Sequence, residues 1–244
     1  MKILFLDLET SPNIVWSWGV HRKTPLSHNN ILKERQIICA CWKWAGERKV
    51  HSIHWGLKEQ NDYEVVKKLG EVVREADLIV GHNSDKFDLG WLRGRTLYHG
   101  LPPLSEGSTE DTYKLARKTL YLNSYRLDYL GQFLKVGRKR KTQDGLWHRV
   151  QFEKNGKALK QMVMYCAQDV KLTERVYNRI SPHVPHPVNK TLLRYAHKWG
   201  CPSCGASIMQ STRDGVRATK AQLKQRRRCG KCHSVYQTPL VGGK

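Results

Sequence analysis

The sequence predicts an α/β fold in which helices flank a mixed β-sheet, followed by a small metal-stabilised module. Through residue 180, apolar runs of strand length are joined by segments whose apolar residues recur at helical spacing. Three prolines then fall within the segment SPHVPHPVN (181–189), and proline interrupts regular structure because it lacks a backbone donor. Two Cys-x-x-Cys pairs follow. We therefore predict a main domain over 1–180, a linker over 181–195 and a second domain over 196–244.

The predicted strands are short apolar stretches rich in β-branched and aromatic residues. Strands over 2–8, 35–46 and 49–56 follow one another without an intervening helix, which favours antiparallel pairing. The later strands, over 77–83 and at the start of 108–120, are separated by helices, which favours parallel pairing. A mixed sheet satisfies both patterns.

The predicted helices each carry an apolar stripe. In residues 62–76, valine, leucine and alanine recur at helical spacing. The segment 86–100 reads as a helix that ends at Gly100, with two prolines shortly beyond it. Further helices are expected within 108–120, over 125–134 and over 157–180, the longest of them.

The charge of the chain indicates its partner. Its 244 residues include 43 Lys and Arg against 21 Asp and Glu, a net charge of +22. A charge of this size favours a polyanion, most commonly nucleic acid. The basic segment 137–156 lacks regular periodicity and is predicted to be a loop. No apolar run approaches the roughly 20 residues that span a bilayer, and the start lacks a secretory layout. We expect a cytoplasmic protein (in the host cytoplasm if a phage encodes it) without a membrane partner.

Two acidic residues end the first predicted strand, MKILFLDLET (1–10). Residues two apart in a strand point to the same side, so the carboxylates of Asp7 and Glu9 should lie close together. At about 4 Å and an effective dielectric constant near 20, two such charges repel by roughly 4 kcal/mol. A protein keeps the pair if a cation lies between the groups or if one is protonated. The alternative is a solvated strand end with incidental acids.

Two further acidic positions favour the cation. Asp88, in GHNSDKFD (81–88), begins a predicted helix directly after a buried strand, where open α/β sheets place their sites. Tyr165 and Asp169, in YCAQD (165–169), are four residues apart and therefore share one helical face. A lone Tyr-x-x-x-Asp pattern is common, so it supports a functional site here only through its order and context relative to the other acidic motifs.

In this order the acids resemble the three exonuclease motifs of the DEDD superfamily, the proofreading 3′–5′ exonucleases with an RNase H-like fold. The three segments are Asp7-x-Glu9, Asn83-x-x-x-Phe87-Asp88 and Tyr165-x-x-x-Asp169. The tyrosine is similar to that of the tyrosine subclass, as in family B polymerase proofreading domains. The other subclass has histidine five residues before the last aspartate, where this chain has Met164. The resemblance covers roughly residues 1–180 and implies an RNase H-like sheet.

The resemblance also implies a chemistry. Carboxylates select hard cations such as Mg²⁺ or Mn²⁺, and two such ions about 3.5–4 Å apart can hold the attacking and leaving oxygens of a phosphodiester. By resemblance, Asp7, Glu9 and Asp169 hold one ion, while Asp7 and Asp88 serve the second. Tyr165 then orients the attacking water by a hydrogen bond, because a neutral phenol suits orientation better than proton abstraction.

Other residues near these motifs are candidates for substrate contact. The resemblance implies that Thr10 touches the terminal nucleotide and that Asn83 orders its loop or contacts the substrate. Phe87 is expected in the core. Trp16 and Trp18 could stack on a base, but packing is the preferred expectation.

The C-terminal cysteines form two pairs, Cys201-Pro-Ser-Cys204 and Cys229-Gly-Lys-Cys232, separated by 24 residues. Four thiolates at this spacing are typical of a tetrahedral structural Zn²⁺ site, and the pattern resembles a zinc ribbon. A segment of about 40 residues with few large apolar side chains needs such a cross-link. Two free redox pairs are the alternative; His233 is available as a substitute ligand, but four cysteines already suffice.

The segment between the cysteine pairs is strongly basic. Residues 186–244 hold 12 Lys and Arg against one Asp, a net charge of +11. Arg226, Arg227 and Arg228 are consecutive, with Lys220 and Lys224 nearby. Phosphate neutralisation by such a patch gives sequence-independent, salt-sensitive affinity. A solvated run of charges and a protein–protein role are the alternatives.

These patterns together predict a metal-dependent 3′–5′ exonuclease that hydrolyses DNA, or RNA, with two Mg²⁺ or Mn²⁺ ions and one structural Zn²⁺. Its partner is a single strand or the 3′ end of a duplex, and a polymerase or replication protein acting in trans is a further candidate. The alternative is a non-catalytic nucleic-acid-binding or recruitment protein that retains the exonuclease fold.

Overall fold

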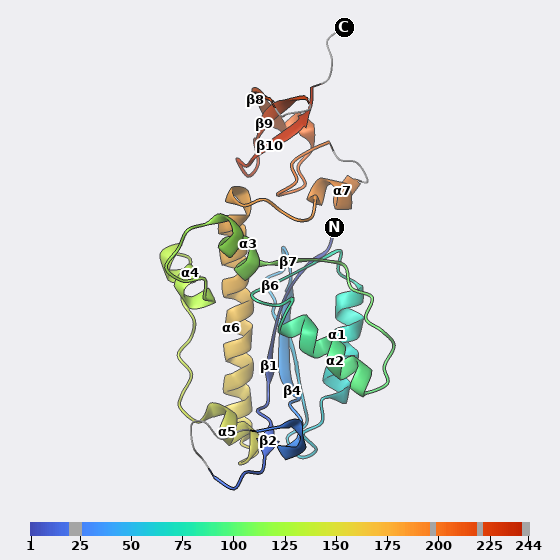
Figure 1. Cartoon of the computed structure of the whole chain (residues 1–244), viewed down its shortest axis with the longest axis vertical. Coiled ribbons are helices and arrows are strands. Elements are labelled where there is room, and N and C mark those ends of the chain that lie inside the picture. The colour runs from blue at the N-terminus through green and yellow to red at the C-terminus, as the bar shows by residue number, and fades with distance from the viewer. Residues whose placement is uncertain (20–25, 196–198, 219–221, 241–244) are drawn as a thin grey trace.

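The computed structural model describes residues 1–19, 26–195, 199–218 and 222–240. A five-stranded sheet lies between helices, and a separate three-stranded sheet follows at the C-terminal end (Figure 1). The predicted fold class, a mixed sheet with flanking helices and a small C-terminal module, is confirmed. Among the described residues, no helix is both long and apolar enough to cross a membrane.

The five-stranded sheet has the order β5–β4–β1–β6–β7. Its central strand β1 (Ile3–Thr10) pairs antiparallel with β4 (Ile37–Trp44) and parallel with β6 (Leu78–Gly81). Beyond these, β5 (His51–His54) continues the antiparallel side and β7 (Ser108–Asp111) continues the parallel side. The antiparallel and parallel halves therefore meet at β1.

Helices cover both faces of this sheet. The helices α1 (Tyr63–Arg74) and α2 (Asp88–Tyr98) lie on one side of it, and α6 (Gly156–Ile180) lies on the other (Figure 1). Because both faces are covered, residues 37–43 of β4 are all buried rather than alternating. Two shorter helices, α3 (Thr112–Thr119) and α4 (Leu127–Phe133), lie beside α6.

The prediction of a loop over 137–156 is wrong in part, because α5 (Leu146–Gln151) forms within it. Leu146 and Val150, one turn apart, are both buried. Gly145 precedes the helix with a φ of 71°, a left-handed conformation that glycine adopts without steric cost. Two apolar positions in a basic segment are too few to produce a periodic signal, and tertiary packing supplies the missing stabilisation.

A small hairpin that the sequence patterns did not predict follows β1. It consists of β2 (Ile14–Val15) and β3 (Ile31–Lys33), which pair antiparallel, with the 3₁₀ turn η1 (His28–Asn30) before β3. The main chains of Trp16 and Asn30 hydrogen bond at 3.0 Å. The Asn30 side chain also donates to the Trp16 carbonyl at 3.1 Å, so the hairpin is held beyond its short ladder.

The C-terminal sheet has the order β10–β9–β8, with both neighbouring pairs antiparallel. Its strands are β8 (Ser211–Ala218), β9 (Leu223–Cys229) and β10 (Val235–Pro239), and the 3₁₀ turn η3 (Ile208–Gln210) precedes them. Among the residues described for this module, the buried apolar cluster consists of Cys201, Ala206, Cys229 and Tyr236. A core this small needs a cross-link for stability.

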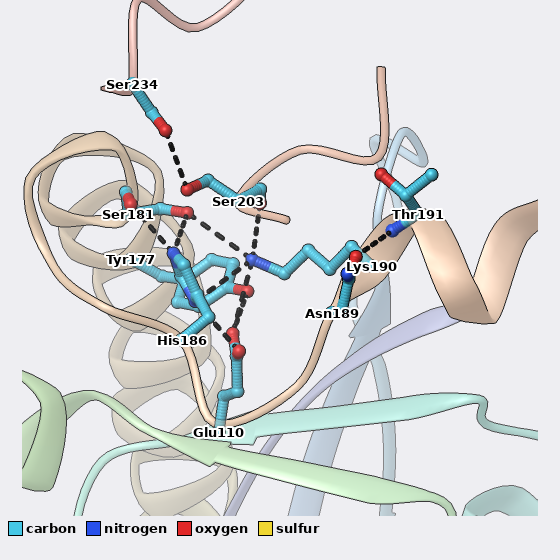
Figure 2. A network of polar contacts seen from close by, with 9 residues as sticks. All are labelled: Glu110, Tyr177, Ser181, His186, Asn189, Lys190, Thr191, Ser203 and Ser234. Carbon is cyan, nitrogen blue, oxygen red and sulfur yellow. Dashed lines mark hydrogen bonds and ion pairs between the residues drawn. The ribbon is translucent and has the colours of Figure 1, made fainter. Parts of the chain in front are cut away.

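The chain between the two sheets is packed rather than extended. After the 3₁₀ turn η2 (Ser181–His183), the short helix α7 (Lys190–Tyr195) begins with a buried lysine. The Lys190 ammonium donates to the Ser203 carbonyl of the C-terminal module at 2.6 Å and lies 3.3 Å from Glu110 of β7 (Figure 2). The predicted division at 180 and 195 stays a prediction, and residue 196 lies outside the described residues.

Candidate functional site

Three carboxylates from two elements converge at the C-terminal half of β1. Asp7 and Glu9 come from β1 and Asp169 from α6, and one oxygen of each lies within 4.8 Å of the other two. The Cys166 thiol donates to the Asp7 carbonyl at 3.3 Å, which places α6 directly against β1. The β1–β4 register shifts between Glu9 and Thr10, and such bulges redirect side chains at strand ends.

Asp88 reaches β1 from another element but does not join this group of three. It is the first residue of α2, and its Oδ1 accepts a hydrogen bond from the Leu8 main chain at 2.9 Å. Burial raises the pKa of Asp88 well above its usual value, and the charge of Asp7 adds to this effect. Asp88 is thus electrostatically coupled to the three carboxylates without sharing their immediate centre.

The cluster opposes its own ionisation. Burial raises the pKa of Asp7 to about 7, and the charge of Asp169 adds to the shift. Burial and the charge of Asp7 likewise raise the pKa of Glu9 well above its usual value. Full ionisation near neutral pH therefore requires a positive charge among these groups.

The carboxylate oxygens fit a divalent metal ion. Among the described residues, Asp7 Oδ2 and Asp169 Oδ1 are buried without a hydrogen-bond partner. Buried carboxylate oxygens without a partner are strongly disfavoured unless a cation or proton satisfies them. An all-oxygen donor set suits Mg²⁺ or Mn²⁺ better than softer metals.

A lysine that the sequence analysis did not single out lies at this cluster. Lys139 Nζ lies 2.7 Å from Asp169 Oδ2 and donates to the Tyr165 hydroxyl at 3.0 Å. Asp128 fixes this segment by accepting a hydrogen bond from the Lys139 main chain at 2.7 Å. The basic run RKRK carries no motif that distinguishes one lysine from its neighbours, so only the tertiary structure identifies Lys139.

Tyr165 lies on the same helical face as Asp169, as its spacing predicts. Burial raises the pKa of Tyr165 to about 12, so the phenol is neutral at physiological pH. Its ring packs edge-to-face against Trp147, with 6.4 Å between the centroids. The Trp147 indole also donates to the Thr10 carbonyl at 3.1 Å, which ties α5 to the end of β1. Trp147 is a second positioning residue without a sequence motif.

Thr10 and Asn83, the candidates for substrate contact in the first two motifs, lie in different surroundings. The Thr10 side chain is largely buried beside β4. Asn83 adopts a φ of 60°, and its main chain donates to Asp111 Oδ1 at 2.8 Å. Asp111 also caps α3, so one carboxylate holds both the loop before α2 and the start of α3. Phe87 packs against the core, as expected.

Comparisons with known proteins agree with this architecture. The family model of the RNase H superfamily matches residues 23–181. The chain belongs to the RNase H superfamily. The matched range starts after Asp7 and Glu9, so the match does not include these two carboxylates, which the structure brings together with Asp169.

Among solved structures, the RNase H fold of this chain is similar to the family B DNA polymerase from the hyperthermophilic archaeon Pyrobaculum calidifontis. The TM-score is 0.53 at 18% sequence identity, which shows similarity of fold. The similarity covers 74% of this chain and 24% of the polymerase chain, so the matching part spans about a quarter of that polymerase. No curated protein matches the chain.

The RNase H fold is followed by a second cluster with metal-ligand chemistry. The sulfur atoms of Cys201, Cys204, Cys229 and Cys232 all lie within 4.8 Å of one another. Cys201 and Cys232 are 3.6 Å apart, and Cys204 and Cys229 are 3.7 Å apart. A tetrahedron with Zn–S bonds of about 2.3 Å has edges of about 3.8 Å, so the sulfur positions fit one Zn²⁺. The main-chain carbonyl oxygens of Cys201 and Ser203 are bound by Thr191 and Lys190.

We expect the purified protein to carry about one zinc ion and to lose it when a ligand is removed. Cys204→Ser should lower the zinc content to less than half and unfold the C-terminal sheet, because that sheet has almost no apolar core. Colorimetric zinc release measures the stoichiometry, and amide exchange over residues 211–239 measures the order of the sheet. Cys41→Ser, which alters a buried cysteine of the main sheet, is the matched control. Equal zinc contents in the two variants would contradict the assignment.

The arginines of β9 do not form a single face. Arg226 and Arg228 are exposed on one side, and both lie beside Asp214 Oδ2, at 3.5 and 3.3 Å. Arg227 is half-buried and points to the other side, where it donates to the Ser211 hydroxyl at 3.4 Å. Lys220, which the sequence analysis added to this patch, lies outside the described residues. Asp214 therefore offsets part of the local charge.

The raised carboxylate pKa values predict how the metal-free protein responds to pH. A carboxyl whose folded pKa exceeds its unfolded value stabilises the fold at low pH, and that contribution is lost as pH rises through the folded pKa. For Asp7 the window runs from about 3.8 to about 7. In EDTA the Tm should therefore fall between pH 4 and pH 8, and Mg²⁺ should restore it at pH 8. Asp7→Asn should flatten this slope in thermal scans, and an unchanged slope would contradict the assignment.

Proposed function

We propose that this RNase H superfamily member is a metal-dependent 3′–5′ exonuclease that hydrolyses phosphodiesters, with DNA favoured over RNA. The convergence of Asp7, Glu9 and Asp169 carries this proposal, together with two buried oxygens that have no hydrogen-bond partner in the described part of the chain. The order of the acidic motifs and the fold similarity to a family B DNA polymerase support it. The 3′–5′ direction rests on the resemblance to proofreading exonucleases.

In this proposal each side chain has a distinct task. Asp7, Glu9 and Asp169 hold the divalent cation, and Asp88 helps to hold a second one from its position against Leu8. When bound, such ions acidify the attacking water and stabilise charge on the phosphate. Thr10 and Asn83 remain candidates for contact with the terminal nucleotide.

In this proposal Tyr165 orients a water molecule. Its phenol is neutral because burial raises its pKa to about 12. Lys139 donates to the phenolic oxygen at 3.0 Å, so the hydroxyl hydrogen is the one donor that the phenol itself offers, with the Asp169 carboxylate as a neighbouring acceptor. A neutral donor held in this way positions the attacking oxygen without removing its proton.

The direct test uses a single-stranded oligonucleotide with a 5′ label, incubated with Mg²⁺, Mn²⁺ or EDTA. We expect a ladder of products shortened one nucleotide at a time from the 3′ end, with the divalent ion required. The rates of shortening of DNA, RNA and duplex substrates of the same sequence show which substrate class is preferred. Binding without metal-dependent shortening would reject the proposal.

One observation favours the alternative of a non-catalytic nucleic-acid-binding protein. The Lys139 ammonium lies 2.7 Å from Asp169 and compensates part of the charge that a metal ion would otherwise neutralise. In that case Mn²⁺ should not stabilise the protein, whereas the exonuclease proposal requires stabilisation that Asp169→Asn abolishes. Thermal scans with Mn²⁺ separate the two functions without an activity assay.

We further propose that the C-terminal module grips nucleic acid with its Zn²⁺-stabilised sheet. This sheet lies beyond the C-terminal end of α6, whereas β1 runs away from it towards α5 (Figure 1). Asp169 is 11 residues before Ile180, so at least about 16 Å of helix separates it from that end. Nucleic acid held by Arg226, Arg227 and Arg228 would therefore be gripped several nucleotides from the acidic cluster.

A further inference from the structure

We propose that the hairpin β2–β3 is a base-stacking platform that receives single-stranded nucleic acid beside the acidic cluster. This inference deepens the proposed function and rests on nucleic acid being the substrate. It assigns a role to Trp16 and Trp18, which the sequence analysis expected to pack in the interior.

The two tryptophans do not pack in the interior. Trp18 is 95% exposed and Trp16 is 43% exposed, and their rings meet edge-to-face with centroids 5.9 Å apart. Val15 and Leu32 of the same hairpin are also exposed. Large apolar side chains that gather on one surface element generally mark a binding site.

Hydrogen bonds hold the main chain of the hairpin on both sides of these rings. Trp16 donates its main-chain N–H to the Asn30 carbonyl and accepts from the Asn30 side chain. Ser27 and Asn30 form a capping box that fixes the turn before β3. The Ser17 hydroxyl, between the two tryptophans, donates to the Gly19 carbonyl at 2.6 Å. A main chain that is already ordered loses less conformational freedom on binding than a mobile one.

The platform lies close to the acidic cluster along the chain. Trp16 is six residues after Thr10, which limits their separation to about 20 Å even in an extended chain. Thr10 is joined to α5 through Trp147. Figure 1 places β2 and α5 at the same end of the long axis, opposite the C-terminal sheet.

Positive charge next to the acidic cluster favours nucleic acid as the molecule that the hairpin binds. A cavity of about 160 Å³ is lined by Arg140 and Lys141 on one side and by Met164 and Tyr165 of α6 on the other. Arg140 and Lys141 are exposed, and neither forms an ion pair with another described residue. Cations at the cavity and exposed rings on the hairpin match the phosphates and bases of one strand.

The bases must be unpaired to use this platform. Within a duplex each base face is covered by its neighbours, so only a single strand offers an open face to a tryptophan ring. Stacking of this kind tolerates every base, which suits an enzyme that removes nucleotides irrespective of sequence.

The test measures binding in EDTA, where hydrolysis is absent, by fluorescence anisotropy of a 5′-labelled single strand. Trp18→Ala and Trp16→Ala should each raise the Kd about 10-fold. Tyr121→Ala removes a fully exposed aromatic residue of the α3–α4 segment and should leave the Kd unchanged. Duplex binding should be the same for all three variants and the unaltered protein.

An abasic strand completes the experiment as a double-mutant cycle. Removing the bases of the last nucleotides should weaken binding to the unaltered protein more than binding to Trp18→Ala, because the contribution of Trp18 is already absent there. Additive losses, or an unchanged Kd for both tryptophan variants, would overturn the platform. If the platform result holds but no strand is shortened with Mg²⁺ or Mn²⁺, the exonuclease proposal fails and the stacking site stands.

Discussion

Replacing Asp7 with asparagine is expected to lower metal-dependent strand degradation by at least about 10³-fold while the protein remains folded. Asp7 lies at the centre of the cluster, since its charge raises the pKa values of both Glu9 and Asp88. Asparagine keeps the size of the side chain but removes one anionic metal ligand. A ligand shared by the ions of a two-metal site affects both attacking and leaving oxygens.

The same substitution should raise the stability of the metal-free protein at pH 8. With burial holding the pKa of Asp7 at about 7, its ionisation works against folding, and asparagine cannot ionise. One variant thus gives opposite signs in two measurements, a lower degradation rate and a higher Tm in EDTA. A merely unfolded variant would lower both.

Asp144→Asn is the matched control for this prediction. Asp144 is exposed in the basic loop and forms no ion pair with another described residue. Its removal should change the degradation rate less than about 2-fold and leave the Tm in EDTA unchanged. If Asp7→Asn behaves like Asp144→Asn in both measurements, the three carboxylates do not form the active site.

The sequence patterns predicted the sheet well because local rules govern it. Every strand of the five-stranded sheet was expected within a few residues, since apolar content, chain order and β-strand length act over short stretches. The closeness of Asp7 and Glu9 could also be predicted from a local rule, because side chains two residues apart in a strand lie on the same side. The cysteine cluster was predictable for the same reason, as ligand spacing determines it.

What the patterns could not supply depends on contacts between distant segments. Lys139 becomes special only because α6 presents Asp169 and Tyr165 to it. The exposure of Trp16 and Trp18 depends on a hairpin with two and three residues per strand, too short for any periodic signal. The ion pairs of Arg226 and Arg228 with Asp214, which offset part of their charge, form only once β8 and β9 pair.

Removing the Lys190 ammonium is expected to destabilise the whole chain, and by more than any surface substitution. Lys190 is 2% exposed, and its ammonium lies between Glu110 of the main sheet and the Ser203 carbonyl of the C-terminal module (Figure 2). In Lys190→Met, the buried carboxylate of Glu110 loses the ammonium ion that α7 contributes. Breaking a buried ion pair on one side destabilises proteins by about 3–5 kcal/mol.

Glu110 shows why the loss should be large. Although burial opposes its ionisation, hydrogen bonding from His186 and the charge of Lys190 hold the pKa of Glu110 below its usual value. Tyr177 also donates to this carboxylate. Glu110 therefore has three partners, which are Tyr177 of α6, His186 of the segment after η2, and Lys190 of α7. Urea unfolding of Lys190→Met measures the loss, and Glu110→Gln combined with Lys190→Met should lose less than the sum of the two single variants.

Lys114→Met is the matched control, because Lys114 forms a 2.8 Å ion pair with Asp85 but is exposed. Exposed pairs contribute about 0–1 kcal/mol, so this variant should remain close to the unaltered protein. Equal losses for Lys114→Met and Lys190→Met would show that the buried network does not join the two parts.

The network also determines where the C-terminal module can be removed. A truncation that deletes residues 186–244 takes away His186 and Lys190, and so leaves Glu110 buried with only Tyr177 as a hydrogen-bond partner. That protein should unfold at several degrees lower temperature, and any lost nucleic-acid affinity would reflect instability. A truncation after residue 195 keeps the three partners of Glu110 and removes the acceptors that the C-terminal module offers to Lys190 and Thr191, namely the carbonyl oxygens of Ser203, Pro202 and Cys201. If this longer form has the same Tm as the shorter one, the Glu110 network does not stabilise the main sheet. If its Tm is higher, the loss of nucleic-acid affinity in this form measures the contribution of the deleted module directly.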